Sequence, residues 1–442
     1  MNITVIGTGY VGLVSGTCFS EFGFHVTCID KDADKIARLN RGEIPIYEPG
    51  LDDLVSRNMS AGRLTFSTIL AQSVAEADAV FIAVGTPERR GDGHADLSYV
   101  YAAAAEIAPF LTGYTVVVTK STVPVGTGRE VERILKETNP DADADVASNP
   151  EFLREGSAIT DFMRPDRVVV GAETDRAKAL MQRLYRPLFL LETPILFTNL
   201  ETSELIKYAA NAFLAVKISY INQMADLCEQ LGADVHDVAK GMGLDKRIGS
   251  KFLHPGPGYG GSCFPKDTQA LVRTAEQANS NVTIVEDVVR YNKSRKTAMA
   301  DRIITAAGGD IKGKQIAILG LAFKPETDDM RESPSLDIIP ILIDHGANIT
   351  AYDPAAMDQA RPLLPETVTY CHDAMATIKG ADITVILTEW NEFRAISPDR
   401  MAATMAGDIV VDLRNIFDPV TMASHHLNLY NIGRMNIKGS DA

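Results

Sequence analysis

The sequence predicts an α/β protein built from two doubly wound domains, which are joined by a long central helix and a helical dimerisation region. Three observations predict this fold. Short apolar runs alternate with helical stretches over residues 1–200, residues 201–230 contain neither Gly nor Pro, and a second alternating pattern begins at Lys314. We therefore expect an α/β domain over residues 1–200, a helical domain over 201–300 and a second α/β domain over 301–442.

The first α/β domain is expected to contain a parallel sheet with crossover helices. Its buried strands are predicted from apolar runs, which lie near residues 2–6, 25–29, 79–84, 115–119 and 167–170. The third run ends in Gly-Thr-Pro and the fourth in Thr-Lys-Ser-Thr-Val-Pro. Because open α/β sheets bind ligands beyond the carboxyl ends of their strands, these breakers mark candidate ligand loops.

The loop after the first strand has the glycine spacing of a Rossmann-like, dinucleotide-binding turn. Gly7, Gly9 and Gly12 follow the strand and open a helix. The first glycine permits a tight turn, the second lets the backbone approach a pyrophosphate, and the third lets the helix pack on the strand. A glycine turn that serves packing alone is the alternative interpretation.

Asp30 ends the next strand. Its separation from the glycine motif in the sequence is close to that expected for a ribose-binding acid. Its carboxylate would bind both adenosine ribose hydroxyls and repel a 2′-phosphate, so NAD is favoured over NADP. Lys35 either reaches the same ribose or is an ordinary surface residue.

The central region begins with one long helix over residues 201–230, closed by Leu231-Gly232. Apolar residues surround much of its circumference, so it is expected to pack against other helices, including those of a second subunit. Residues 234–300 continue as helices, interrupted by a Gly- and Pro-rich loop at 254–261.

The second α/β domain repeats the N-terminal order of strand, glycine, helix, strand and acid. Further strands are expected at Ile383–Leu387 and Ile409–Asp412. Its loop Gly320–Pro325 keeps one glycine and lacks the rest of the dinucleotide signature. A second NAD is therefore not expected there, and a nucleotide diphosphate held by Lys324 is favoured.

The composition is that of a soluble globular protein, with 45% hydrophobic and 23% charged residues. The formal net charge is −15 and basic residues are scattered, whereas a nucleic-acid surface clusters basic charge. No apolar run reaches the roughly 20 residues of a membrane helix, and the N-terminus lacks the features of a signal peptide. We expect neither nucleic acid nor a membrane as a partner.

The five cysteines indicate a reducing compartment, and the cytoplasm is the predicted location. They are Cys18, Cys28, Cys228, Cys263 and Cys371. No two of them form a CxxC pair or the ligand spacing of a zinc site, so no metal is expected.

Cys263 differs from the other cysteines in its surroundings. It follows a glycine-rich turn and lies three residues before Lys266 and four before Asp267. A thiol has a pKa near 8.5, and a nearby ammonium group or a helix N-terminus raises the fraction of thiolate. The pattern favours a nucleophile, with a small buried cysteine as the alternative. We expect the other four cysteines to be structural.

Lys207 and Asn211 lie four residues apart in the long helix and therefore on one face. An ammonium and a carboxamide directed at one point would stabilise an oxyanion formed when a thiolate adds to a carbonyl. A solvated helix face is the alternative, although polar side chains in an apolar helix require partners.

Five motifs together resemble the UDP-glucose/GDP-mannose dehydrogenase family. They follow one another in order over nearly the whole chain, and such a series is more specific than any one member. The motifs are Gly7–Gly12, Ser121–Pro124, Asn149–Gly156, Gly258–Asp267 and Leu321–Pro334.

The resemblance implies a four-electron oxidation of a primary alcohol on a nucleotide sugar, with two NAD⁺ and Cys263 as the nucleophile. The aldehyde would be held as a thiohemiacetal, oxidised to a thioester and hydrolysed to the acid. Further roles are implied for five residues. Lys207 and Asn211 stabilise developing negative charge, Asp267 and a water held by Thr122 move protons, and Glu151 assists hydrolysis.

The resemblance also implies the binding residues. Those for NAD are Gly7, Gly9, Tyr10, Val11, Gly12, Asp30, Lys35, Thr86, Thr122, Glu155, Lys266 and Arg331. Those for the sugar nucleotide are Glu151, Phe152, Leu153, Arg154, Glu155, Lys207, Asn211, Arg247, Phe252, Leu253, His254, Pro255, Gly256, Gly260 and Lys324. Arg247 matches an arginine that reaches a neighbouring subunit's substrate, so a homodimer is implied. For Arg331 and Lys324 the alternative is an ion pair with Asp328, Asp329 or Glu332.

The substrate that the resemblance favours is UDP-glucose, with UDP-glucuronate as the product. Oxidation of GDP-mannose or UDP-N-acetylmannosamine is the nearest alternative. A two-electron hydroxyacid dehydrogenase with a structural Cys263 would release one NADH per substrate. A nucleotide-binding regulator without turnover is the alternative of another class.

Overall fold

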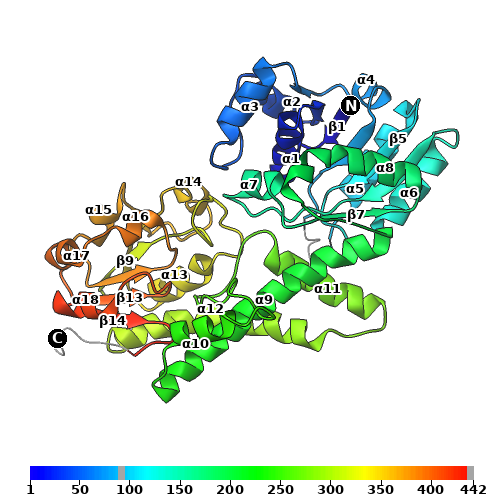
Figure 1. Ribbon diagram of the computed structural model, residues 1–442. Helices are drawn as coiled ribbons and strands as arrows, with labels where there is room; N and C mark the ends of the chain where they lie inside the picture. Colours follow the sequence, from blue (N-terminus) through cyan, green and yellow to red (C-terminus); the bar gives the residue numbers. More distant parts are fainter. Residues whose placement is uncertain (88–94, 436–442) are drawn as a thin grey trace. The chain divides into compact units, whose positions relative to one another are not determined.

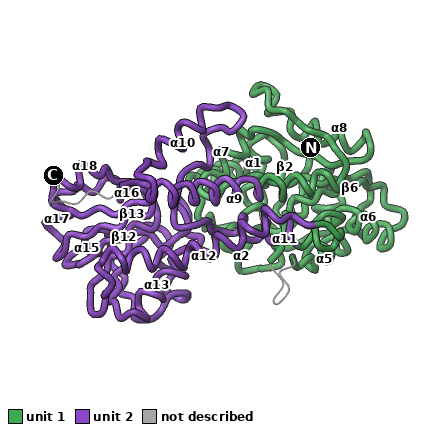
Figure 2. Tube along the Cα trace, turned by 90° about the horizontal axis from the view of Figure 1, so that it is seen from below, with its two compact units in different colours: residues 1–210, 273–280 green, residues 211–272, 281–442 purple. Residues whose placement is uncertain are grey.

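The computed structural model (Figure 1) describes residues 1–87 and 95–435. The segment 436–442, for which the sequence predicts a disordered tail, lies outside the described residues. The chain divides into two compact units (Figure 2), which comprise residues 1–210 with 273–280, and residues 211–272 with 281–442.

The first unit is built on an eight-stranded sheet with the strand order β3-β2-β1-β4-β5-β6-β7-β8. Neighbouring strands run parallel except β6 and β7, which are antiparallel. The strands are β1 (Asn2–Ile6), β2 (His25–Ile29), β3 (Leu64–Ser67), β4 (Ala79–Ile82), β5 (Thr115–Thr119), β6 (Ala144–Ser148), β7 (Val168–Ala172) and β8 (Ile195–Thr198).

Helices cover both faces of this sheet, because its central strands are apolar on both sides. In β4, Phe81 packs into one core with Phe19 of α1, whereas the neighbouring Ile82 packs into a second core with Val100 of α5. The helices are α1 (Tyr10–Glu21), α2 (Ala33–Asn40), α3 (Leu51–Ser60), α4 (Ala71–Ala75), α5 (Ser98–Ile107), α6 (Thr127–Thr138), α7 (Ala158–Met163) and α8 (Asp175–Leu184).

The second unit contains a six-stranded, all-parallel sheet with the order β11-β10-β9-β12-β13-β14. Its strands are β9 (Gln315–Leu319), β10 (Asn348–Tyr352), β11 (Thr369–Tyr370), β12 (Ile383–Ile386), β13 (Ile409–Asp412) and β14 (Asn428–Asn431). In both sheets the chain begins at a central strand, moves to one edge, and then crosses to the other side. The two domains are therefore doubly wound in the same way, and the predicted fold class is confirmed.

Helix α9 (Leu200–Leu231) corresponds to the long helix expected over residues 201–230, and it begins in the first unit and continues in the second. Three further helices follow in the central part of the chain: α10 (Val235–Gly243), α11 (Phe264–Gln277) and α12 (Thr283–Ala306). The helices of the C-terminal domain are α13 (Pro334–Asp344), α14 (Met357–Ala360), α15 (Ala374–Ile378), α16 (Asn391–Arg394), α17 (Pro398–Thr404) and α18 (Pro419–Ser424). The three-domain division at residues 200 and 300 stays a prediction.

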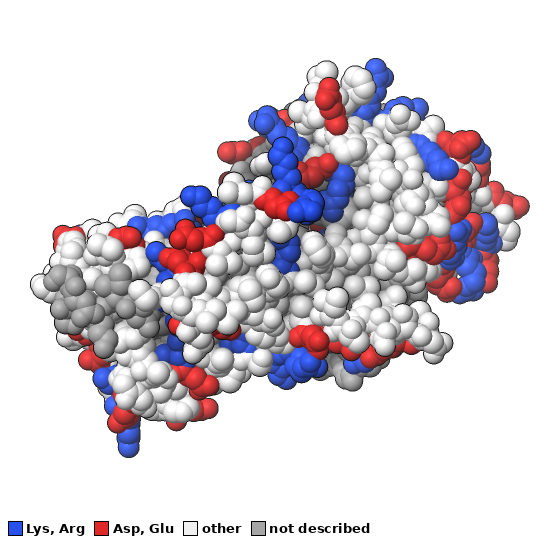
Figure 3. Space-filling model, turned by 60° about the horizontal axis from the view of Figure 1, so that its bottom comes forward, with Lys and Arg blue, Asp and Glu red and all other residues white. Residues whose placement is uncertain are grey.

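Charged side chains of both signs are interspersed on the face shown in Figure 3. Charged side chains of the described residues also form ion pairs, as Arg133 does with Glu130 and Glu137 on α6. None of the described helices combines the length and the apolar character needed to cross a bilayer. In the described residues no cluster of His, Cys, Asp and Glu could hold a metal ion.

Candidate active site

The loop between β1 and α1 has the shape that a dinucleotide needs. Gly7 has φ +100°, and a Cβ there would lie 2.7 Å from the carbonyl oxygen of Ala83. A Cβ on Gly12 would overlap the carbonyl oxygen of Gly7, whereas a Cβ on Gly9 would meet no atom within 4 Å. Two glycines are therefore required by packing. Gly9 leaves the backbone open where a pyrophosphate would approach the start of α1.

Asp30 lies at the end of β2, and its carboxylate faces this loop. Its Oδ2 accepts hydrogen bonds from the backbone N and the Oγ1 of Thr8 at 2.9 and 2.6 Å and from Lys35 Nζ at 3.0 Å. Burial opposes ionisation of Asp30, but these hydrogen bonds outweigh it and lower the pKa to about 2. The structure therefore brings the predicted residues together around a fixed anion, which fits the ribose of NAD and would repel a 2′-phosphate.

The second α/β domain uses the corresponding acid differently. Asp353 follows β10, and its Oδ2 accepts hydrogen bonds from the backbone N of Leu321 and Ala322 at 2.7 and 3.0 Å. Its Oδ1 accepts two more from the backbone N of Ala355 and Ala356, both at 2.9 Å. These four donors are all backbone groups, whereas Asp30 also accepts from the side chains of Thr8 and Lys35. That the second domain binds no NAD stays a prediction.

Thr86 and Thr122 lie in the loops after β4 and β5, where the strand ends predict a ligand site. The hydroxyl of Thr86 donates to the backbone oxygen of Thr122 at 3.0 Å. The two loops are thus held together at the carboxyl edge of the sheet, beside the strand that carries the glycine turn.

Glu151 and Lys207 form a buried ion pair in the first unit. Lys207 Nζ lies 3.1 Å from Glu151 Oε1, and the two side chains are 3% and 5% exposed. Glu151 Oε2 accepts from the backbone N of Leu153 at 2.5 Å, which fixes the turn that follows β6. Lys207 therefore belongs to a buried polar site, and the alternative of a solvated helix face is wrong for this residue.

The segment after Glu151 is held by cations and by the start of α7. The Phe152 ring contacts the Arg167 guanidinium at 3.8 Å and lies 5.3 Å from Lys207 Nζ. Arg154 forms an ion pair with Asp161 at 2.6 Å. The side chain of Arg154 is thus engaged by α7, and its backbone remains the part predicted to contact a sugar nucleotide.

Glu48 is a buried residue of this region that the sequence patterns did not single out. It accepts hydrogen bonds from the hydroxyl of Tyr10 and from the backbone N of Gly156 and Ala158, the last two at 2.7 and 2.8 Å. It connects the glycine turn to the loop before α7. Burial is what marks Glu48 as important, and the sequence of a loop does not show which of its side chains are buried. No sequence pattern could therefore have identified Glu48.

Cys263 lies immediately before α11 in the second unit. Its backbone oxygen accepts from the backbone N of Asp267 at 2.8 Å, which closes the first turn of the helix, and its thiol is partly exposed. A helix N-terminus favours a thiolate. By contrast, burial raises the pKa of the Cys18 and Cys28 thiols, for Cys28 to about 12, as expected for structural cysteines.

Asp267 and Asn211 meet beside the same turn. Asn211 Nδ2 donates to Asp267 Oδ2 at 2.6 Å, and Lys266 Nζ lies 3.7 Å from Asp267 Oδ1. Both Asn211 and Asp267 are buried. Asn211 is thereby oriented by an acid 56 residues away in the sequence, a partner that sequence spacing does not reveal.

The glycine turn before Cys263 packs on the segment that follows β9. Gly261 has φ +83°, its N donates to the Arg331 oxygen at 2.8 Å, and a Cβ on it would meet the Phe323 ring. Tyr259 and Asn292 exchange two hydrogen bonds of 2.8 and 3.0 Å. These contacts hold the thiol-bearing turn in one conformation.

The predicted substrate loop Phe252–Gly256 is held by buried polar side chains. Asn222 accepts from Gly256 N at 2.8 Å, and Arg295 donates to Gly256 O at 2.7 Å. Arg414 also lies beside Gly256 and donates to the backbone oxygens of Leu387 and Phe323 at 2.6 and 2.9 Å. The sequence patterns missed Arg414, because an arginine after a C-terminal strand carries no local signal.

Three further predicted residues, Arg331, Lys324 and Arg247, lie on the surface or near it, whereas Gly260 is buried. Arg331 forms an ion pair with Asp329 at 2.7 Å, which is one of the alternatives considered for it. Lys324 Nζ lies 5.6 Å from the Phe323 ring, and Arg247, 89% exposed, pairs with Asp245 at 2.6 Å. Their contacts with NAD, with substrate or with a second subunit stay predictions.

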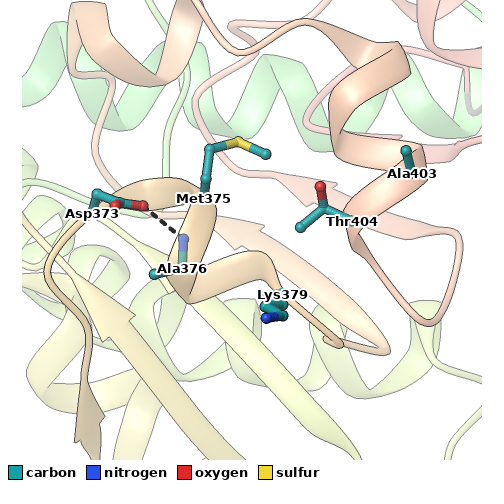
Figure 4. Close-up of a pocket in the computed structure, with 6 residues that line it drawn as sticks. All are labelled: Asp373, Met375, Ala376, Lys379, Ala403 and Thr404. Atoms are coloured by element: carbon teal, nitrogen blue, oxygen red, sulfur yellow. Dashed lines mark hydrogen bonds between the residues drawn. The ribbon is translucent and has the colours of Figure 1, made fainter.

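Two surface cavities contain none of the predicted residues. One of about 450 Å³ is lined by Asp373, Met375, Ala376, Lys379, Ala403 and Thr404 (Figure 4). Asp373 accepts a hydrogen bond from Ala376 N at 2.7 Å and so caps α15. The other, of about 400 Å³, lies beside β8 and α8. Neither is lined by a cysteine or by the glycine turn after β1.

Comparisons with known proteins match most of the chain to one family. Models of the UDP-glucose/GDP-mannose dehydrogenase family match its NAD-binding domain at residues 1–189, its central domain at 201–294 and its UDP-binding domain at 317–419. A UDP-glucose 6-dehydrogenase of Rhizobium meliloti (strain 1021) is 60% identical over 98% of this chain and 100% of that protein.

Solved structures agree with this match. A UDP-glucose dehydrogenase from the archaeon Pyrobaculum islandicum has a TM-score of 0.89 and 39% identity, covering 98% of this chain and 97% of that chain. A UDP-D-ManNAc dehydrogenase from Pyrococcus horikoshii has a TM-score of 0.85 and 28% identity, covering both chains fully.

Proposed function

This chain belongs to the UDP-glucose/GDP-mannose dehydrogenase family, and on that premise we propose that it oxidises UDP-glucose to UDP-glucuronate with two NAD⁺. As a member of this family it is an NAD-dependent oxidoreductase with a UDP-binding domain. One observation favours UDP-glucose as the substrate over the other sugar nucleotides. Identity to the protein named UDP-glucose 6-dehydrogenase is about twice that to the protein named for UDP-D-ManNAc.

Cys263 is the proposed nucleophile, because it is partly exposed and lies at the start of α11. Cys18, Cys28 and Cys228 are buried, and Cys371, which is also partly exposed, follows the edge strand β11. Bound NAD⁺ supplies a hydride acceptor for each of two oxidations. The alcohol first loses a hydride and a proton to become an aldehyde, and the Cys263 thiolate then forms a C–S bond to it. Loss of a second hydride leaves a thioester, and water cleaves the C–S bond to release the carboxylate and the thiol.

Five other residues have proposed roles in binding charge, moving protons or assisting hydrolysis. Lys207 and Asn211 stabilise negative charge on the substrate oxygen, which suits an ammonium and an amide held in buried polar pairs. Asp267 and a water on Thr122 move protons. Glu151 assists hydrolysis of the thioester.

A homodimer formed through α9 completes the proposal. Phe213, Tyr220 and Leu227 are 63%, 45% and 47% exposed, and Leu231 is 72% exposed. Spacings of seven residues and then four place these side chains on one face of the helix, as in helices that pair along a seam. A second copy of α9 is the proposed partner, and Arg247 would then reach the neighbouring subunit's substrate.

The cytoplasm is the proposed location. All five cysteines lie in the described part of the chain and none forms a disulfide, which suits a reducing compartment.

The NADH formed per nucleotide sugar tests the activity. With limiting UDP-glucose and excess NAD⁺, we expect two NADH and one UDP-glucuronate per UDP-glucose. One NADH would support a two-electron dehydrogenase, and none would support a regulator. Faster turnover of GDP-mannose or UDP-N-acetylmannosamine than of UDP-glucose would identify that sugar nucleotide as the substrate.

The covalent step is tested separately with Cys263→Ala. We expect this variant to form no UDP-glucuronate, while Cys228→Ala, which alters a structural cysteine, retains the two-to-one yield. Undiminished acid production by Cys263→Ala would contradict the covalent scheme.

A further inference from the structure

Lys120 is a buried cation for which the proposed mechanism has no role. It follows β5 and is 4% exposed. Its Nζ donates to Asn149 Oδ1 at 3.0 Å and to the Tyr185 hydroxyl at 3.4 Å, and it lies 5.7 Å from the Phe162 ring. Within the described residues, every group in contact with this ammonium is uncharged. A buried charge without a contacting counter-ion costs free energy, so its presence requires an explanation.

The hydrogen bonds around Lys120 do not require its charge. Asn149 Oδ1 also accepts from the Tyr185 hydroxyl at 2.5 Å, and Asn149 Nδ2 donates to Val169 O at 2.7 Å. An apolar side chain of similar length at position 120 would leave Asn149 hydrogen-bonded. We conclude that packing and hydrogen bonding do not account for an ammonium group at this position.

The charged groups that act on Lys120 are Glu151 and Lys207. The pKa of Lys120 is lowered to about 8, because burial and the charge of Lys207 lower it by more than the charge of Glu151 raises it. Asn149, which binds Lys120, lies two residues before Glu151 on the loop after β6. The three groups therefore form one cluster in the interior of the first unit.

The charge balance of this cluster matters for an oxyanion. Glu151 lies 3.1 Å from Lys207 and neutralises most of its field. The protonated Lys120 adds one positive charge, and a protein interior screens that charge weakly. The cluster then carries a net charge of +1, which favours negative charge on a nearby substrate oxygen.

We propose that Lys120 is a positioning residue of the active site, whose buried charge offsets that of Glu151 and leaves Lys207 with a net positive field for the developing oxyanion. This inference rests on the proposed function, because it needs a reaction in which Lys207 faces a substrate oxygen.

The test compares Lys120→Met with the wild-type enzyme. At pH 6.5 we expect kcat to fall on the order of tenfold, less than for loss of a direct oxyanion donor, because Lys120 acts through its neighbours. We expect the KM for NAD⁺ to be unchanged and the melting temperature to be equal or higher, since a buried charge is removed. Lys120→Gln, which keeps a hydrogen-bond donor and loses the charge, should behave in the same way.

The ratio of wild-type to variant kcat as a function of pH isolates the charge, because titrations common to both enzymes cancel. We expect this ratio to be largest near pH 6.5 and to approach one above pH 8, where wild-type Lys120 loses its proton. The control is Tyr185→Phe, which removes the hydrogen bonds of the Tyr185 hydroxyl with Asn149 and Lys120 but removes no charge. It should lower the melting temperature and retain kcat.

Two results would overturn the inference. One is a ratio that stays constant with pH. The other is a loss of kcat in both position-120 variants that is matched by a loss of stability, as a structural role would give. An inactive wild-type enzyme would instead contradict the proposed function, whereas an active wild type with fully active position-120 variants would contradict only the role of Lys120.

Discussion

At the scale of single residues, the chemistry depends on charged groups whose partners lie far away in the sequence. Asp30, which the glycine motif predicts, is fixed as an anion by Thr8 and Lys35. Glu151 and Asp267, in contrast, each meet a residue of α9 that is 56 positions away. Motif spacing therefore predicts local contacts in the site and leaves the long-range pairs to be found in the fold.

The Asp30 carboxylate should control coenzyme affinity. In Asp30→Ala we expect the KM for NAD⁺ to rise about 10- to 100-fold, the usual effect of losing hydrogen bonds to a charged group. The KM for UDP-glucose should change little, and discrimination against NADP⁺ should weaken because the carboxylate no longer repels a 2′-phosphate. Initial rates with both coenzymes measure this. The exposed neighbour Asp34 provides the control Asp34→Ala, and equal KM changes in the two variants would contradict the assignment.

The residues that sequence patterns missed share a physical reason. Lys120 stands in the motif after β5 and Glu48 in a loop, and neither position has a periodicity that signals burial. Both are buried polar side chains, and their roles can be inferred only from the groups that they contact in the fold. Cys263 was predictable because a thiol beside a glycine turn, a lysine and an aspartate is rare in local sequence.

At the scale of elements, strand prediction succeeded where apolar runs are long and failed at short or edge strands. The five runs of the first domain and the four of the second correspond to observed strands. The patterns missed β3, β8, β11 and β14, which have one neighbour each, and β6, whose sequence ADVAS contains little bulky apolar surface. An apolar run signals burial on both faces, and β3, β6, β11 and β14 lack such a run. The sequence of β8, ILFT, has one, although the strand is not fully buried.

The start of α6 depends on a carboxylate supplied by α9. Glu204 accepts from the backbone N of Gly126 and Gly128 at 2.6 and 2.7 Å. Burial raises the pKa of Glu204 to about 7, although these two hydrogen bonds lower it. The folded state therefore binds a proton that the unfolded state has already released between pH 4.5 and 7, so this group's contribution to stability falls as pH rises through that window.

In Glu204→Gln the loss of stability that Glu204 causes between pH 4.5 and pH 7 should be absent. The difference in unfolding free energy between wild type and variant should shrink by up to about 3 kcal/mol between pH 4.5 and pH 7. Urea unfolding at both pH values measures it. Glu201 is the matched control, because Arg129 holds the pKa of this neighbouring carboxyl below its usual value. Its stabilisation is present above pH 4.5 and is lost only at lower pH, so for Glu201→Gln the difference should stay nearly constant between pH 4.5 and pH 7. A constant difference for Glu204→Gln would contradict the argument.

At the scale of the whole molecule, the proposed dimer follows from the face of α9 that the single chain leaves exposed. The aromatic and aliphatic side chains of this stripe recur at helical spacing, whereas isolated exposed apolar residues are common on any protein. The sequence predicted a buried helix here, because apolar residues surround its circumference. One copy of the chain buries only part of that circumference, and a second copy would bury the rest.

Charge placed on this stripe should separate the subunits. We expect the wild-type protein to have the mass of a dimer by light scattering after gel filtration, and the double variant Phe213→Glu, Tyr220→Glu to have that of a monomer, because like charges would meet across the seam. Since Arg247 is expected to reach the neighbouring substrate, the monomer should also have a raised KM for UDP-glucose. Ile284 on α12 is comparably exposed at 67% and lies off the stripe, so Ile284→Glu should remain dimeric. If the double variant keeps the dimer mass of the wild type, the interface does not lie on this face of α9. If the wild-type protein is a monomer, the proposed homodimer is wrong.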